Sequence, residues 1–296
     1  MVRTNLGAAL SEGSALLKNG GVETPALDSS LLLAFAAGLT RERLYAHTDR
    51  PLALNKKAVF DGLIRRRLAG ESVAVLVGRK EFCGLDFIVT ADVLVPRPDT
   101  ETLVEAALGI LSAAGMKGKP ALDLCTGSGA VAIAVKHARP DLDMSASDIS
   151  PAALSVAREN ARRLVGGGVT FYEGDLFDAL PRASAGFSGP SLRDRTFALI
   201  TANPPYLPAA ELAGLSREVR REPALALDGG ADGLDLIRRV TREAPARLES
   251  GGVLLMEADG SQMAALRGLM AERGLTEISV RADLGGRPRV ICGKKP

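Results

Sequence analysis

The chain has 296 residues, of which 46% are hydrophobic and 24% are charged, and its formal net charge is +2. This length allows two domains with sizeable cores, while a charge so close to neutral gives no electrostatic basis for nonspecific nucleic-acid binding. No apolar run approaches the ~20 residues that cross a bilayer, the N-terminus lacks a signal-peptide pattern, and the three cysteines lie far apart without metal-ligand spacing. These features predict a globular protein of the reducing cytoplasm with no bound metal.

Residues 1–76 have the pattern of a small bundle of short helices. Leucines recur at roughly helical spacing up to Asn19, where two glycines end the pattern. Thr24 followed by Pro25 predicts the start of a second helix, which Gly38 ends, and a further helix is expected over residues 55–68. No group of residues in this bundle suits catalysis.

A hairpin and a proline-rich joint follow the bundle. Apolar residues flank Gly84 in the manner of two short strands, and a Pro-Arg-Pro sequence interrupts the chain before a helix that begins near Asp99 or Thr100. We therefore expect a helical domain (1–76), a hairpin linker (77–98) and a larger second domain (99–296).

Apolar strands alternate with amphipathic helices through the second domain. Strands are expected at 121–125, 142–148, 169–173, 197–202 and 253–257, with helices beginning near 128, 150, 232 and 261, and with a closing pair of strands at 277–281 and 289–292. This alternation predicts an α/β fold with a doubly wound, mostly parallel sheet. The Ser/Gly/Pro-rich segment 183–195 is expected to be a mobile surface loop.

The tetrapeptide Asn203-Pro204-Pro205-Tyr206 follows the fourth strand directly. Two prolines end the strand, because neither nitrogen donates a hydrogen bond and each ring fixes φ. A rigid turn therefore holds an amide and a phenol at the strand end where open α/β sheets bind ligands. The alternative is a plain turn that begins with asparagine.

A glycine loop leaves the first strand of this domain. Gly127 and Gly129 allow the backbone to turn tightly against a ligand, and with Ala132 they also fit a loose dinucleotide fingerprint. Asp123, just before the loop, would repel a pyrophosphate, so an adenosyl ligand that carries a positive charge is favoured.

Two acidic residues stand at the next strand ends. Asp148 lies 19 residues after Gly129 (148 − 129) at the end of the second strand, where a carboxylate suits ribose hydroxyls. The alternative is that it caps the helix that begins at Ser150. Asp175 and Leu176, after the third strand, fall where an adenine would lie.

Together these motifs resemble the class I S-adenosylmethionine-dependent methyltransferases that methylate planar amide or amino nitrogens. Further segments resemble the peptide chain release factor glutamine methyltransferases (PrmC/HemK): 71–82, 95–101, 221–225, 229–234, and Glu257 with Gln262. The resemblance covers roughly residues 71–296. Cys125 stands where the family usually has glycine, Leu176 where some members have an aromatic residue, and 183–195 resembles an insertion.

The resemblance implies methyl transfer from S-adenosylmethionine to the side-chain amide N5 of the glutamine in the Gly-Gly-Gln motif of class I release factors. S-adenosylhomocysteine is the implied by-product, and no metal is needed. The helical domain would recognise the release factor, and the protein would act as a monomer without membrane or direct nucleic acid. Catalytic roles fall on Asn203, Pro204 and Tyr206, substrate binding on these three and Pro205, and cofactor binding on Cys125, Thr126, Gly127, Ser128, Gly129, Asp148, Asp175, Leu176 and Asn203.

A glutamine nitrogen is a poor nucleophile, so the site must orient it and stabilise developing charge. We expect Asn203 Oδ1 and the Pro204 carbonyl to accept one amide N–H each, with Tyr206 packed on the amide plane. By the same resemblance Arg97, Thr100 and Glu101 would line the cofactor cleft. The alternative for these three is the start of a helix with an acidic first turn.

Three other functions stay open at this stage. An adenine or cytosine amino-methyltransferase faces the same nitrogen chemistry but must hold nucleic acid and usually flip a base, and this chain has no tryptophan and three tyrosines. A ribosomal-protein glutamine methyltransferase differs around the Pro-Arg-Pro segment. A non-catalytic nucleotide-binding protein would not need an intact Asn-Pro-Pro-Tyr sequence.

Overall fold

The computed structural model describes residues 4–112, 115–180 and 195–296, which form two compact units. One unit is the chain through Arg79 together with Ser216–Arg221, and the other is Lys80–Leu215 together with Glu222–Pro296. The expected loop at 183–195 lies outside the described residues, apart from Arg195.

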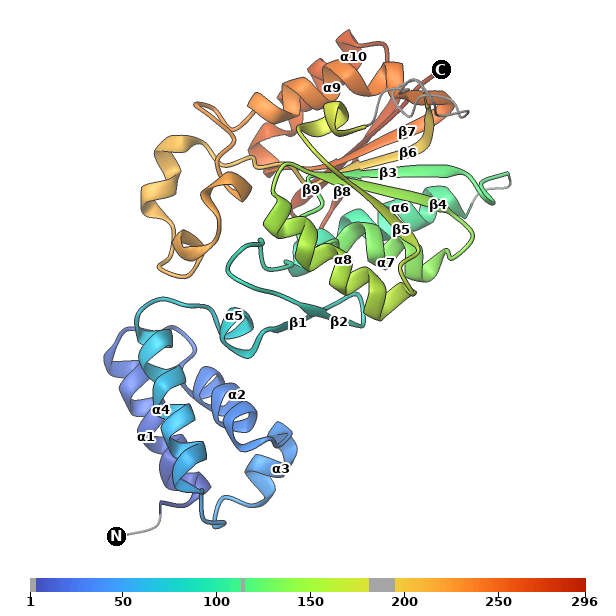
Figure 1. The fold of residues 1–296 in the computed structure, drawn as a ribbon. Helices are drawn as coiled ribbons and strands as arrows, with labels where there is room; N and C mark the ends of the chain where they lie inside the picture. The colour runs from blue at the N-terminus through green and yellow to red at the C-terminus, as the bar shows by residue number, and fades with distance from the viewer. Residues whose placement is uncertain (1–3, 113–114, 181–194) are drawn as a thin grey trace. The chain divides into compact units, whose positions relative to one another are not determined.

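The smaller unit is a helical bundle (Figure 1). Its helices are α1 (Leu6–Asn19), α2 (Pro25–Ala37), α3 (Arg41–Ala46), α4 (Leu54–Leu68) and α5 (Val73–Val77). The three expected helices are confirmed, and α3 and α5 are additional. Leucines and Phe60 form the core of the bundle.

A short segment from late in the chain belongs to this unit. Arg221 donates through Nη2 to the carbonyl of Ala69 at 2.8 Å. The buried Arg67 pairs with Asp28 at 2.7 Å and also with Glu218. Segment Ser216–Arg221 is therefore fastened to the helices by backbone and ionic contacts.

The larger unit is built on a seven-stranded sheet with the order β5-β4-β3-β6-β7-β9-β8. The strands are β3 (Pro120–Leu124), β4 (Asp143–Asp148), β5 (Val169–Glu173), β6 (Phe197–Ala202), β7 (Leu248–Glu257), β8 (Thr276–Ala282) and β9 (Pro288–Lys294). Strands β3 to β7 pair in parallel, and β9 pairs antiparallel with β7 and β8. The hairpin of β1 (Arg79–Phe82) and β2 (Leu85–Ile88) precedes the sheet. The predicted doubly wound, mostly parallel fold is confirmed.

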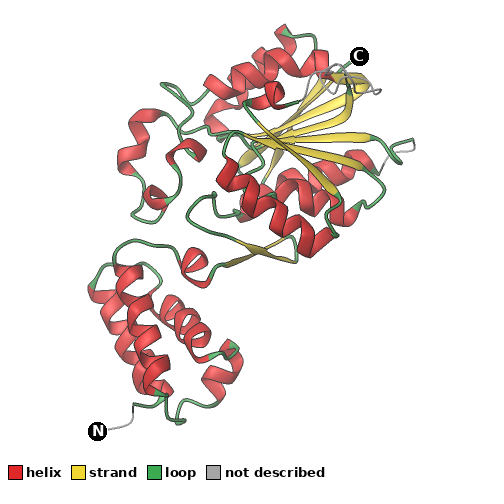
Figure 2. Cartoon of the chain, viewed as in Figure 1, coloured by secondary structure: helices red, strands yellow, loops and turns green. Residues whose placement is uncertain are grey.

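Helices cover both faces of the sheet, as the red and yellow layers of Figure 2 show. One face carries α6 (Glu101–Leu111), α7 (Ala130–Ala138) and α8 (Pro151–Val165), and the other carries α9 (Asp235–Arg247) and α10 (Met263–Glu272). Single-turn helices are η1 (Pro98–Thr100), η2 (Leu176–Ala179), η3 (Ala209–Gly214), η4 (Val219–Arg221), η5 (Ala224–Ala226) and η6 (Gly260–Gln262). Each face of the sheet has its own apolar core.

The strand order fixes where a ligand can bind. The chain winds outward from β3 to β4 and β5, and then returns to β6 beside β3 before it winds the other way. The carboxyl ends of β3 and β6 therefore meet at the topological switch point, where such sheets form their binding crevice. No helix within the described ranges is long and apolar enough to span a membrane.

Candidate functional site

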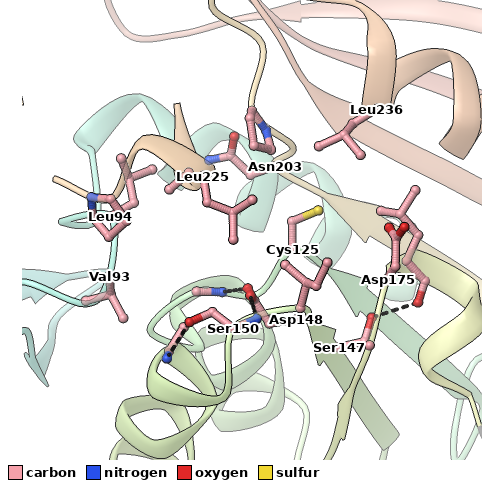
Figure 3. Close-up of a pocket in the computed structure, with 18 of the residues that line it drawn as sticks. Val93, Leu94, Cys125, Ser147, Asp148, Ser150, Asp175, Asn203, Leu225 and Leu236 are labelled. Carbon is pink, nitrogen blue, oxygen red and sulfur yellow. Dashed lines mark hydrogen bonds between the residues drawn. The ribbon is translucent and has the colours of Figure 1, made fainter. Parts of the chain in front are cut away.

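A cavity of about 270 Å³ opens at this switch point. Figure 3 shows Asp148 and Ser150 on one side of it and Asn203 and Leu225 on the other. Six of the predicted cofactor residues line the cavity: Cys125, Gly127, Asp148, Asp175, Leu176 and Asn203. Thr126, Ser128 and Gly129 are not among its lining residues.

The glycine loop after β3 depends on left-handed backbone conformations. Gly127 has φ +55° and Gly129 has φ +82°, and a Cβ on Gly129 would lie 2.7 Å from Cδ1 of Ile133. Cys125 also has a positive φ of 55°, which is uncommon for a residue with a side chain. The glycine expected from the resemblance would fit this position without strain.

Asp148 holds the loop and faces the cavity. Its Oδ2 accepts from the backbone N–H of Gly127 at 2.8 Å, and its Oδ1 accepts from that of Ser150 at 2.9 Å. The N-cap of α8 is Ser150, whose hydroxyl accepts from the N–H of Ala153, so the capping alternative for Asp148 is wrong. Burial raises the pKa of Asp148, and the backbone N–H groups oppose that rise. The N–H of Ile149 is a third backbone group that lowers this pKa, so one of about four lone-pair positions stays open for a ligand.

Asp123 differs from its expected role, because it does not line the cavity. It is 1% exposed, and its two oxygens accept from the hydroxyls of Thr126 at 2.6 Å and Thr201 at 2.7 Å. Burial raises the pKa of Asp123 to about 6, against the lowering effect of these hydroxyls. Asp123 therefore braces the loop from within the sheet instead of facing a cationic ligand.

Arg239 on α9 was not foreseen in the sequence. Its Nη2 pairs with Oδ2 of Asp175 at 2.8 Å, and both residues line the cavity. Leu176 beside Asp175 is buried and has φ +48°. Apolar side chains were also missed, because they come from segments far apart in the sequence: Val93, Leu94, Ile149, Pro223, Leu225 and Leu236.

The turn after β6 contributes Asn203 and Pro205 to the cavity, whereas Pro204 and Tyr206 are not among the lining residues. Asn203 donates through Nδ2 to the hydroxyl of Thr100 at 3.2 Å. The phenol of Tyr206 donates to Oε1 of Glu257 at 3.4 Å. Gln262 donates to the carbonyl of Tyr206 at 2.9 Å, which holds the turn from its other side.

Of Arg97, Thr100 and Glu101, which the resemblance places in the cofactor cleft, one contacts the Asn203 turn. Arg97 pairs with Glu222 at 2.6 Å, and Glu101 accepts from the backbone N–H of Cys83 at 2.9 Å. Neither lines the cavity, and both lie where η1 and α6 begin. Thr100 alone of these three bonds to the Asn203 turn.

Glu257 is the second buried carboxylate near the site. It ends β7, it is 1% exposed, and within the described part of the chain its Oε2 has no hydrogen-bond partner. Burial raises the pKa of Glu257 to about 7, while Thr100, Arg289 and Tyr206 lower it and Asp99 raises it. Burial and the Glu257 charge raise the pKa of Tyr206 to about 12, so its phenol keeps its proton.

Comparison of the amino-acid sequence with known proteins shows the family to which this chain belongs. The chain is 39% identical to the release factor glutamine methyltransferase of Geobacter sulfurreducens over 94% of this chain and 92% of that protein. It is 42% identical to that of Moorella thermoacetica over 95% of each. The chain belongs to the family of release factor glutamine methyltransferases.

Two family models agree with this membership. The PrmC N-terminal domain matches residues 8–78, and a methyltransferase domain matches residues 116–222. Among solved structures, the hMettl16 catalytic domain in complex with MAT2A 3'UTR hairpin 6 has a TM-score of 0.54 at 10% identity, over 78% of this chain and 81% of that one. At that identity the likeness concerns the fold alone, which this release factor glutamine methyltransferase shares with other methyltransferases.

Proposed function

We propose that this family member transfers the methyl group of S-adenosylmethionine to the amide nitrogen N5 of the glutamine in the Gly-Gly-Gln motif of class I release factors. The observation that carries the proposal is that Asn203 shares one cavity with Asp148. An acceptor for amide hydrogens and an acceptor for ribose hydroxyls thus face the same space.

The cavity suits S-adenosylmethionine. Asp148 would accept from the ribose hydroxyls, the glycine loop would pass close beneath the amino-acid part, and Leu176 and Ile149 would flank the adenine. Asp175 is already paired with Arg239, so this ion pair would border the base instead of presenting a free carboxylate. When bound, the sulfonium supplies the methyl group and its reactivity.

The residues of the turn would orient the acceptor. Asn203 Oδ1 and the carbonyl of Pro204 are proposed to accept one hydrogen each from the glutamine amide, which fixes the direction of its nitrogen. The amide nitrogen becomes positively charged as it takes the methyl group and S-adenosylhomocysteine leaves, and the same two oxygens would stabilise that charge until the nitrogen loses one proton to water. Tyr206 is directed at Glu257, so we propose that it supports the turn and covers the amide with its ring edge or face.

We also propose the division of labour between domains. Residues 1–76 would recognise the release factor, residues 77–98 would link, and residues 99–296 would bind the cofactor and transfer the methyl group. The enzyme would act as a cytoplasmic monomer, without metal and without direct contact to nucleic acid.

A labelling experiment tests the substrate. Methyl-labelled S-adenosylmethionine is offered with a class I release factor, with the same factor carrying Gln→Ala in its Gly-Gly-Gln motif, with purified ribosomal proteins, and with DNA. We expect label on the unmodified factor only. Label on ribosomal proteins or DNA would replace the proposed substrate with one of the alternatives.

Two variants separate acceptor binding from cofactor binding. Asn203→Ala should reduce transfer by at least about 10²-fold, because it removes one of two orienting acceptors, and should leave cofactor binding measurable. Asp148→Ala should instead raise the cofactor Kd by about tenfold or more. Calorimetric titration and turnover assays measure both, and near-normal transfer by Asn203→Ala would refute the acceptor role.

A further inference from the structure

The amide of Asn203 is oriented by a group that does not touch the cavity. Its Nδ2 donates to Oγ1 of Thr100, which is 4% exposed and absent from the cavity lining. Since the oxygen and nitrogen of an amide point in different directions, a partner for Nδ2 turns Oδ1 away from Thr100. No described residue donates to that Oδ1.

The Thr100 hydroxyl accepts in its pair with Asn203. A hydroxyl has one hydrogen to donate and two lone pairs with which to accept. Asn203 Nδ2 donates to this hydroxyl at 3.2 Å, so the oxygen of Thr100 is the acceptor in this pair. Its hydrogen stays available to the Glu257 carboxyl, whose pKa the Thr100 hydroxyl lowers against the rise caused by burial.

We propose that Thr100 and Glu257 are positioning residues for the methyl acceptor. Thr100 fixes the amide of Asn203 with Nδ2 inward and Oδ1 toward the substrate, and Glu257 holds the same turn through Tyr206. The proposal rests on the proposed function of Asn203. The substrate glutamine presents the two N–H donors of its amide. If the Asn203 amide were flipped, its own N–H groups would face these donors and repel the substrate glutamine. Orientation of this one amide therefore decides whether the glutamine is held.

The surroundings of Glu257 support a role beyond packing. Its Oε2 is buried without a hydrogen-bond partner in the described part of the chain, and Tyr206 reaches Oε1 only at 3.4 Å. Arg289, the cation that lowers the pKa of Glu257, also pairs with Asp99: its Nη2 lies 3.1 Å from Oδ2 of Asp99. A buried carboxylate this poorly satisfied is costly for stability. The hydrogen bond that Glu257 accepts comes from Tyr206, in the turn that carries Asn203.

Three threonine variants test the proposal. Thr100→Val removes the hydroxyl at nearly constant volume, Thr100→Ser keeps it, and Thr102→Val is the matched control. Thr102 is a buried threonine on α6 that makes no hydrogen bond to the turn within the described residues. We expect kcat to fall about tenfold to 10²-fold in Thr100→Val, and to stay within about threefold in the other two.

The cofactor Kd is measured alongside, and it should stay within about twofold in all three variants. A fall in kcat with unchanged Kd separates positioning from general damage. Equal kcat in Thr100→Val and the wild type would overturn the proposal, as would an equal loss in Thr100→Ser or Thr102→Val. The wild type in the same assay tests the proposed function separately.

A spectroscopic readout does not depend on turnover. The side-chain amide protons of Asn203 are followed by NMR in ¹⁵N-labelled protein, and are assigned by their loss in Asn203→Ala. We expect a separated pair with slow solvent exchange in the wild type and Thr100→Ser, and a solvent-like pair in Thr100→Val. A solvent-like pair in the wild type would overturn the proposal even if methyl transfer is normal.

Discussion

Two buried carboxylates stand on either side of β6, and they are held in opposite ways. Asp123 on β3 has a threonine hydroxyl on each oxygen, at 2.6 and 2.7 Å. Glu257 on β7 has one long contact from Tyr206 at 3.4 Å and an oxygen with no hydrogen-bond partner among the described residues. Both are 1% exposed, so burial alone does not distinguish them.

The difference teaches which carboxylate is structural. Short bonds to Thr126, in the glycine loop, and Thr201, on β6, join two neighbouring strands and fix the loop at the edge of the cavity. Glu257 makes no such short hydrogen bond within the described residues, although its contact with Tyr206 places it behind the turn that carries Asn203. We infer that Asp123 holds the glycine loop and that Glu257 holds the turn that carries Asn203, through Tyr206.

The largest expected effect comes from Asp123→Ala. Two buried hydroxyls would lose their acceptor and a small cavity would form, so we expect the free energy of unfolding to fall by roughly 3 kcal/mol. Denaturant titration measures the change. Asp123→Asn keeps an acceptor and should cost less than about half of that. A loss below about 1 kcal/mol in Asp123→Ala would break the comparison, because Asp123 would then be no brace.

Part of this arrangement was predictable from the sequence. Asn203 and Asp148 each end a strand, and the carboxyl ends of parallel strands meet at one edge of the sheet. Their presence in one cavity therefore followed from alternation of strands and helices. The same reasoning misplaced Asp123: its position before the loop was evident, but its direction into the sheet depends on Thr201 across the strand pair.

Other features needed tertiary contacts. β7 begins at Leu248, five residues before its expected start, because Leu248 pairs with Phe197 across a bulge despite the glycines that follow. Helix α5 is rich in valine, which favours strands, but Ser72 caps it and Gly78 ends it. The contact of Thr100 with Asn203 joins residues 103 positions apart. No local pattern encodes such a pairing.

An intermediate effect is expected from Glu257→Gln. The phenol of Tyr206 donates to Glu257 at 3.4 Å, and an amide that presents donors in place of the carboxylate would disturb this contact and the turn that carries Asn203. We expect kcat to fall about tenfold, while the free energy of unfolding at neutral pH stays equal or rises, because a buried charge is removed. Turnover with a release factor and denaturant titration measure the two quantities. Full activity together with lower stability would make Glu257 a second structural carboxylate.

The smallest expected effect is a pH dependence of stability that belongs to Glu257. Burial raises the pKa of Glu257 to about 7, whereas in the unfolded chain this group has its ordinary pKa of 4.5. Between these values the native state binds more protons than the unfolded state, so the free energy of unfolding falls as pH rises. The pKa of Glu257 also depends on its charged and polar neighbours, which include Arg289, Asp99 and Tyr206. Asp123, whose pKa is raised to about 6, lowers the free energy of unfolding in the same direction but at lower pH.

The wild type should therefore lose about 1 kcal/mol of its free energy of unfolding relative to Glu257→Gln between about pH 6 and about pH 7. Paired denaturant titrations across that range measure the difference, and parallel curves would show that Glu257 does not titrate there.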